Sequence, residues 1–141
     1  MMTVYDKAKY HYDNDFPPQL SQDQAYVHIG FFLGWLIEKE LCSEEFLEDY
    51  EEEIKAFKAR ELLSSRLFKM AAGVLASDML NEEGNAFAAS KYDSYMSDYL
   101  YILNQEDAES SYHVPDTWEN YKLICEELDI VYEMWCQKRE R

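Results

Sequence analysis

The chain has 141 residues, and its 29 Asp and Glu against 13 Lys and Arg give a formal net charge of −16 at pH 7. This surplus of acids disfavours direct binding to nucleic-acid phosphates and to an anionic membrane surface. Hydrophobic residues make up 48% of the chain and aromatic residues 16%, which excludes a chain too polar to fold and suffices for a core without metals or disulfides. We expect one globular domain over residues 1–141.

The sequence predicts an all-α domain of five or six helices, beginning with a short helix over 4–12 that the prolines at 17–18 separate from the next element. The second helix, about 22–41, is apolar nearly all round, which is typical of a helix in the centre of a core. Its Gly30 and Gly34 lie one turn apart on one face. A neighbouring helix can therefore approach closely there, although each glycine costs about 1 kcal/mol of helix propensity.

Ser43 is expected to cap a third helix, because its hydroxyl can accept a hydrogen bond from a backbone N–H of the first turn. The apolar stripe of this helix continues to Phe57. A short fourth helix is predicted over about 65–71, ending at Gly73 as a left-handed cap.

A long fifth helix is predicted over about 77–104, followed by a loop over 105–115. Asp116 and Glu119 have the spacing of a capping box for the last helix, which has the most regular amphipathic pattern in the chain. No stretch of useful length alternates with a period of two, so we expect no substantial sheet.

Three features predict where the protein resides. Its cysteines, Cys42, Cys125 and Cys136, are odd in number and lack paired spacing, which is typical of reduced thiols. Residues 1–15 contain no apolar run of the kind found in signal peptides. The longest apolar stretch, 29–37, is shorter than the roughly 20 residues that span a bilayer. We expect a soluble cytoplasmic protein.

Acidic residues crowd one short segment and define the candidate partner-binding site. This segment consists of Glu44, Glu45, Glu48, Asp49, Tyr50, Glu51, Glu52 and Glu53. A run of like charges is usually a solvated surface. The alternative interpretation is a docking surface for a basic protein, because a strong negative field accelerates encounter and interleaved aromatic rings can anchor the partner.

A second candidate is a polar cluster made of His28, Asn81, Glu82, Glu83 and Asn85. A histidine and two carboxylates from different helices can hold a divalent metal in a helical bundle. However, the Glu-x-x-His spacing of such sites is missing, and a core histidine beside a polar first helical turn explains the same residues. The chain also contains no Gly-rich phosphate loop, nucleophile elbow or HExxH motif. We therefore predict no catalytic residues, no cofactor and no bound metal.

Four motifs carry a resemblance to a known family. They are YDKAKYHYDNDFP at 5–17, GFFLGWLIEKEL at 30–41, NEEGNAFA at 81–88 and DTWENY at 116–121. With them the chain resembles a family of small acidic bacterial proteins of unknown function, and this resemblance implies no activity. In size and acidity the chain is also similar to immunity proteins of bacterial toxin systems, which neutralise basic toxin domains made by the same cell.

The resulting hypothesis is an acidic protein-binding module rather than an enzyme, acting as an immunity protein that occludes the active site of a basic toxin domain. The alternatives are a metal-dependent enzyme or small-molecule binder built on the His/Glu cluster, and a homodimeric structural protein. The sequence leaves monomer and homodimer open.

Overall fold

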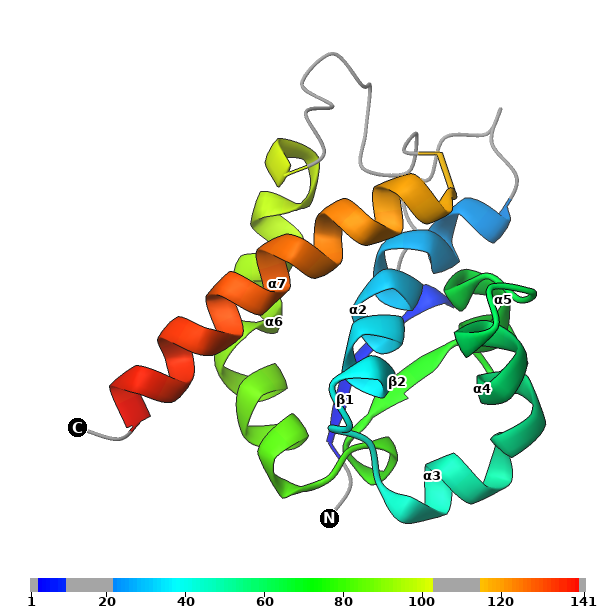
Figure 1. The fold of residues 1–141 in the computed structure, drawn as a ribbon, viewed down its shortest axis with the longest axis horizontal. Coiled ribbons are helices and arrows are strands. Elements are labelled where there is room, and N and C mark those ends of the chain that lie inside the picture. Colours follow the sequence, from blue (N-terminus) through cyan, green and yellow to red (C-terminus); the bar gives the residue numbers. More distant parts are fainter. Residues whose placement is uncertain (1–2, 10–21, 103–114, 140–141) are drawn as a thin grey trace.

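The computed structural model describes residues 3–9, 22–102 and 115–139 (Figure 1). In chain order, its elements are β1 (Val4–Lys7), the 3-10 helix η1 (Gln22–Tyr26), α2 (Val27–Glu38), α3 (Glu44–Asp49), α4 (Glu51–Lys58), α5 (Ser64–Met70), β2 (Val74–Ala76), the 3-10 helix η2 (Ser77–Met79), α6 (Glu82–Ile102) and α7 (Trp118–Arg139). The expectation of a mainly helical single domain is confirmed, with one small sheet added.

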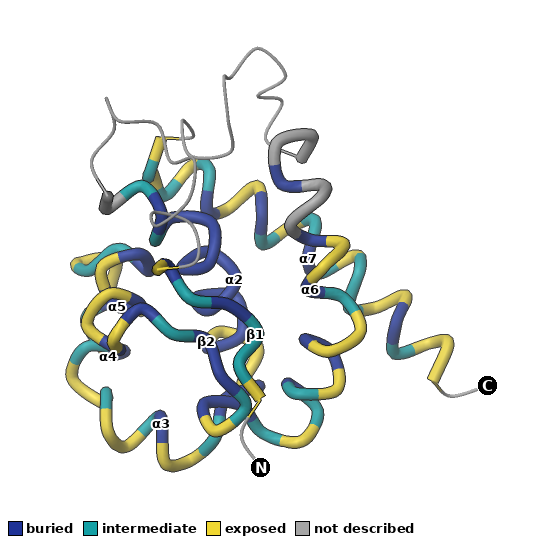
Figure 2. Tube along the Cα trace, turned by 180° about the vertical axis from the view of Figure 1, so that it is seen from behind, coloured by how far each residue is buried: buried dark blue, intermediate teal, exposed yellow. Residues whose placement is uncertain are grey.

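The second predicted helix is the centre of the core. Every residue of α2 from Val27 to Ile37 is buried, and Figure 2 shows this helix in the buried interior of the molecule. The helix is shorter than predicted, because residues 22–26 form a 3-10 helix and the chain turns into the left-handed region at Glu40 (φ 60°). The apolar sequence of α2 therefore identifies its position in the fold but not its ends.

The two glycines of α2 allow α5 to cross it closely, as predicted. A Cβ added to Gly30 would lie 2.6 Å from Cα of Ser65, and one added to Gly34 would lie 2.9 Å from Cβ of Ser64. Backbone and side-chain atoms of α5 thus occupy the space that larger residues would need. The predicted left-handed position at Gly73 is also confirmed (φ 66°).

A two-stranded antiparallel sheet replaces part of the predicted N-terminal helix. β1 pairs with β2, with Val4 opposite Ala76 and Lys7 opposite Val74. The prediction of a helix over 4–12 is therefore wrong at residues 4–7, because pairing with a distant segment outweighs local helix propensity. Positions 10–12 of that prediction lie outside the described residues.

The two longest helices, α6 and α7, pack against α2 (Figure 1). α6 begins at Glu82 rather than near 77, because β2 and η2 use the preceding residues. The helix α7 is capped by Thr117, whose Oγ1 accepts a hydrogen bond from the Asn120 N–H at 3.1 Å. The prediction that Asp116 caps this helix is therefore wrong. The predicted loop over 105–115 lies outside the described residues except for its last position.

Candidate functional site

The acids predicted as a docking surface lie on two consecutive helices, α3 and α4. The prediction of one continuous helix is wrong at Tyr50, whose backbone leaves helical geometry (φ −121°, ψ 29°). On the two sides of this break, α3 packs beside η2 and α4 packs beside α5. The predicted cap is confirmed, because Oγ of Ser43 accepts a hydrogen bond from the Phe46 N–H at 3.2 Å.

We call this surface the acidic face. It comprises Glu44, Glu45, Glu48, Asp49, Glu51, Glu52 and Glu53, with Tyr50 among them. All of the acids are exposed except Glu53, which is half-buried like Tyr50. The structure therefore brings the residues predicted from the sequence together on one surface. It also places an aromatic ring among them, packed against Phe46 at a centroid distance of 5.1 Å.

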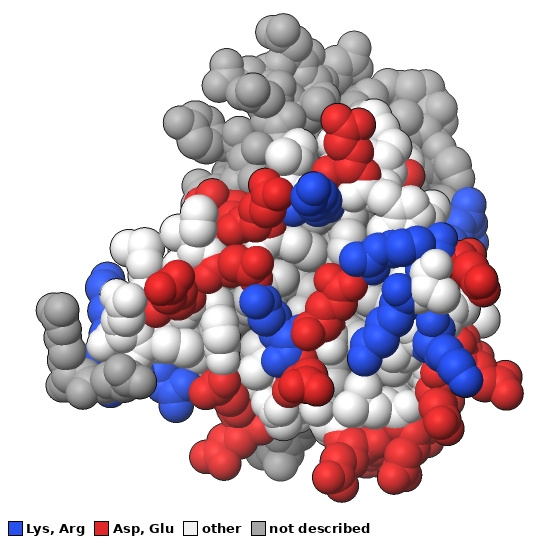
Figure 3. Space-filling view, viewed as in Figure 1, with Lys and Arg blue, Asp and Glu red and all other residues white. Residues whose placement is uncertain are grey.

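Within the described part of the chain, none of the acids of the acidic face forms an ion pair. The ion pairs of the described residues lie on other surfaces, for example Lys39 with Asp129 at 2.9 Å and Arg60 with Glu38 at 2.8 Å. In Figure 3 carboxylates gather along the lower edge, over α3, whereas acidic and basic side chains alternate across the middle of the view. The acidic face is thus a local concentration of negative charge, and the next basic residues in the sequence, Lys55 and Lys58, lie in the last turn of α4.

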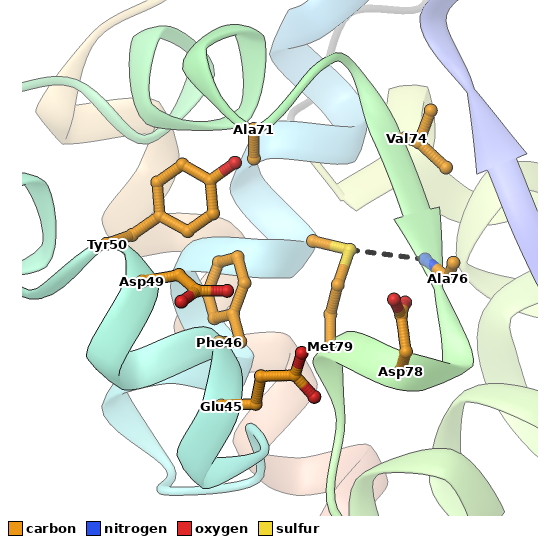
Figure 4. Close-up of a pocket in the computed structure, with 9 residues that line it drawn as sticks. All are labelled: Glu45, Phe46, Asp49, Tyr50, Ala71, Val74, Ala76, Asp78 and Met79. Carbon is orange, nitrogen blue, oxygen red and sulfur yellow. Dashed lines mark hydrogen bonds between the residues drawn. The ribbon is translucent and has the colours of Figure 1, made fainter.

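A cavity of about 250 Å³ opens beside the acidic face, between α3 and the β2–η2 segment (Figure 4). Its lining residues are Glu45, Phe46, Asp49, Tyr50, Ala71, Val74, Ala76, Asp78 and Met79. In Figure 4 the carboxylates of Glu45 and Asp49 lie on the α3 side and that of Asp78 on the opposite side, with Phe46 and Met79 between them. The cavity therefore combines apolar walls with an anionic rim.

Hydrogen bonds hold the two sides of this cavity together. Oγ of Ser43 donates to the carbonyl of Asp78 at 2.9 Å, and the Ser43 N–H donates to the carbonyl of Met79 at 2.9 Å. The sulfur of Met79 in turn accepts from the Ala76 N–H at 3.4 Å. Since Ser43 also caps α3, one residue fixes the helix relative to the opposite wall.

The alternative polar cluster is divided between two places, because four of its residues lie at the start of α6 and His28 lies in the core. Asn81 caps α6, because its Oδ1 accepts from the Gly84 N–H at 2.8 Å. Oδ1 of Asn85 accepts a hydrogen bond from the Tyr5 hydroxyl at 2.7 Å. The other members at this end of α6 are Glu82, which is exposed, and Glu83, which binds the hydroxyl of Tyr132 and, at 3.3 Å, Arg139. These contacts give the residues roles in joining α6 to β1 and α7.

His28 lies in the core, where its Nε2 is 4.0 Å from Oδ2 of Asp6. Asp6 is a buried carboxylate that accepts hydrogen bonds from the Tyr92 hydroxyl at 2.6 Å and the Lys7 N–H at 2.8 Å. Burial, together with the charge and hydrogen bond of Asp6, raises the pKa of Tyr92 well above its usual value. The hydroxyl of Tyr95 donates to the His28 carbonyl. The sequence analysis missed this network, because no local pattern marks Asp6 as buried.

A second cleft, of about 380 Å³, lies along α7. There the Arg60 guanidinium lies 4.9 Å from the ring centroid of Trp118 and forms its ion pair with Glu38. The Tyr121 hydroxyl donates to the same carboxylate at 2.8 Å. The polar ends of Glu38, Arg60 and Tyr121 in this cleft thus already bind one another, so we take the α3-side cavity as the candidate for a ligand.

The three cysteines are not linked by disulfides. Burial raises the pKa of Cys42 to about 12, and burial likewise raises the pKa of Cys125 to about 12. Both are therefore thiols at neutral pH, and a thiol is a far weaker nucleophile than a thiolate. These two side chains are packing residues in the described structure.

Among the helices of the described residues, none has both the length and the apolar composition that crossing a bilayer requires. In the segments 3–9, 22–102 and 115–139, no three His, Cys, Asp or Glu side chains are grouped so that they could hold a metal ion.

Together, these observations define an acidic, mainly helical domain with a carboxylate-rimmed cavity. A family model described as "Domain of unknown function (DUF7832)" matches residues 4–114. Because the match covers most of the chain, the chain belongs to this family, and the resemblance to a family of unknown function is confirmed. The matched region contains the acidic face and the cavity but ends before α7 and the DTWENY motif. Neither the curated proteins nor the solved structures gave a match.

Proposed function

We propose that this domain binds a basic protein through the acidic face, and that it acts as an immunity protein which occludes the active site of a basic toxin domain. The observation that carries the proposal is the concentration of carboxylates on α3 and the first turn of α4, none of which forms an ion pair within the described residues. Residues 44–53 contain seven carboxylates and no Lys or Arg. Five of these acids lie in the first turns of α3 and α4, where the positive end of the helix dipole favours anions. Glu48 is not favoured in this way, because it follows Glu44 by four residues and Glu45 by three, and like charges at these spacings destabilise a helix.

The acidic face supports both fast and specific association. A concentrated negative potential steers a basic partner and raises its association rate, an effect that falls steeply with ionic strength. Affinity requires in addition a desolvated anchor near the centre of the interface. The cavity beside Tyr50 supplies apolar surface for such an anchor, next to the same carboxylates.

The proposed mechanism is steric and electrostatic. Toxin domains that act on nucleotides or nucleic acids hold phosphate groups with Lys and Arg side chains. Carboxylates of α3 and α4 would pair with these cations, and the body of the domain would then cover the toxin's cleft. The proposal implies that the protein acts in the cytoplasm, where such a toxin would otherwise reach its target.

The test is affinity capture from cells of the source organism with three forms of the protein. The face variant carries Glu44→Gln, Glu48→Gln and Glu52→Gln. A matched variant with the same change in net charge carries Glu119→Gln, Glu126→Gln and Glu133→Gln on α7, where all three residues are exposed.

The wild type and the α7 variant should each recover one basic protein, encoded beside this gene, and high salt should release it. The face variant should recover far less. Equal recovery by all three forms, or a captured protein without excess positive charge, would contradict the proposal.

A further inference from the structure

The cavity beside the acidic face has the size of a single long side chain. Sites for drug-sized ligands usually measure roughly 300–1,000 Å³, and this cavity measures about 250 Å³. We propose that it receives one arginine side chain of the basic partner, an assignment that rests on the proposed function. The arginine would be the central anchor of the interface, and the surrounding acids would form its polar rim.

The walls suit the aliphatic part of an arginine. Phe46, Ala71 and Met79 line the cavity, and each keeps at most 8% of its surface exposed. Figure 4 shows Ala71 at one end and the Met79 side chain between Phe46 and Ala76. Methylene groups entering this space leave water for apolar contacts, while the charged end stays near solvent. Methionine adapts readily to such a guest, because its thioether chain is flexible and polarisable.

The rim suits the guanidinium group. Glu45 and Asp49 approach from α3 and Asp78 from η2, so acceptors surround the opening on two sides (Figure 4). A guanidinium has five N–H donors in a planar fork and can serve several carboxylates at once, whereas an ammonium is a compact point charge with three donors. The half-buried ring of Tyr50 adds a surface on which a guanidinium can stack.

The cavity is already formed before the partner arrives. Ser43 joins α3 to Asp78 and Met79 through the hydrogen bonds described above. Binding therefore does not require the two walls to be brought together, which reduces the entropic cost of association.

The test uses small cations on the full chain, with the methionine methyl groups labelled with ¹³C. The probes are n-butylguanidinium, n-butylammonium and guanidinium, titrated at constant ionic strength and followed by NMR. The Met79 methyl group reports on the cavity, and Met134, exposed on α7, serves as the reference.

The Met79 signal should shift saturably with n-butylguanidinium, while Met134 stays unchanged. Affinity for n-butylguanidinium should exceed that for guanidinium about tenfold, which burial of two methylene groups is sufficient to produce. It should also exceed the affinity for n-butylammonium. Equal affinities for n-butylguanidinium and guanidinium would contradict burial of the alkyl chain in the cavity. Tighter binding of n-butylammonium would contradict the assignment of the guest as arginine.

Two variants separate shape from charge. Ala71→Leu should fill the cavity and abolish the shift, with folding checked by thermal unfolding. Asp49→Asn keeps the shape and should weaken n-butylguanidinium binding about tenfold, through loss of a charge-assisted hydrogen bond. The control change Glu133→Gln removes an exposed charge on α7, away from the cavity, and should leave affinity within about twofold, as expected for exposed, screened charges. Equal effects of Asp49→Asn and Glu133→Gln would contradict the assignment.

Failure of this inference differs from failure of the proposed function. If capture of the basic protein depends on the acidic face but the small cations do not shift Met79, the pocket assignment is wrong and the proposed function stands. If n-butylguanidinium binds as expected but capture ignores the acidic face, the proposed function is wrong and the arginine site stands.

Discussion

Glu48 lies near the end of α3, and among the described residues its carboxylate has no ion-pair partner. It follows Glu44 by four residues and Glu45 by three, and each such like-charged pair destabilises a helix by about 0.2–0.5 kcal/mol. Glu and Gln have nearly equal helix propensities. Glu48→Gln should therefore raise the free energy of unfolding by about 0.4–1 kcal/mol at low ionic strength.

Glu51 provides a control of opposite sign. It is the first residue of α4 and precedes Lys55 by four residues. The positive end of the helix dipole favours an anion at that position, typically by about 0.3–1 kcal/mol. Glu51→Gln should therefore lower the free energy of unfolding, although it removes the same charge from the same surface.

Urea denaturation of both variants at 0.01 M and 1 M NaCl tests this reasoning. The Debye length falls from about 30 Å to about 3 Å between these conditions, so both differences from wild type should shrink at high salt. A Glu48→Gln variant that is less stable than wild type, or a gain that high salt leaves unchanged, would refute it. Folding would then favour Glu48, and its position would no longer support selection for binding.

Three further predictions concern the core and its edge. Gly30→Ala should lower the free energy of unfolding by about 1–2 kcal/mol net, because the α5 backbone must move to make room for the added methyl group. Ala86→Gly, at an exposed position of α6, measures how much helix propensity alone changes stability. A Gly30→Ala variant as stable as wild type would contradict this prediction. Tyr92→Phe removes a hydrogen bond to buried Asp6 and should cost about 1.5–3 kcal/mol in urea denaturation; an unchanged midpoint would count against it. Burial raises the pKa of Asp116, so folding favours its protonated form, and the stability that this group contributes to the fold at low pH is lost as pH rises through the folded-state pKa. Asp116→Asn should therefore gain stability relative to wild type between pH 3 and 7, and parallel pH curves would disprove this.

Much of the helical fold could be predicted, because its signals are local. An apolar stretch from Val27 to Ile37 can be satisfied only inside a core, and the two glycines of α2 mark the close crossing within the same stretch. Ser43 is recognisable as a cap from its position before two glutamates. Each of these features depends on residues within a few positions of one another.

The missed features depend on distant residues. Val4 pairs with Ala76, and neither segment alternates long enough to predict a strand. The break at Tyr50 separates α3, which packs beside η2, from α4, which packs beside α5. The apolar stripe in the sequence continues across this break and therefore does not mark it.

The acidic face was visible in the sequence because its residues are contiguous. The cavity beside it was not, because Ala71 and Met79 come from segments more than twenty positions beyond Phe46 and Asp49 in the chain. Sequence analysis therefore located the charge of the candidate site but not the cavity that would give it specificity.

Hydrogen–deuterium exchange on the complex with the captured basic protein tests the central claim most directly. Exchange should slow at 44–58 on α3 and α4 and at 74–79 along the cavity, while the exposed side of α7 exchanges as in the isolated protein. Protection confined to α7 or to the start of α6, with α3 and α4 unchanged, would contradict binding through the acidic face.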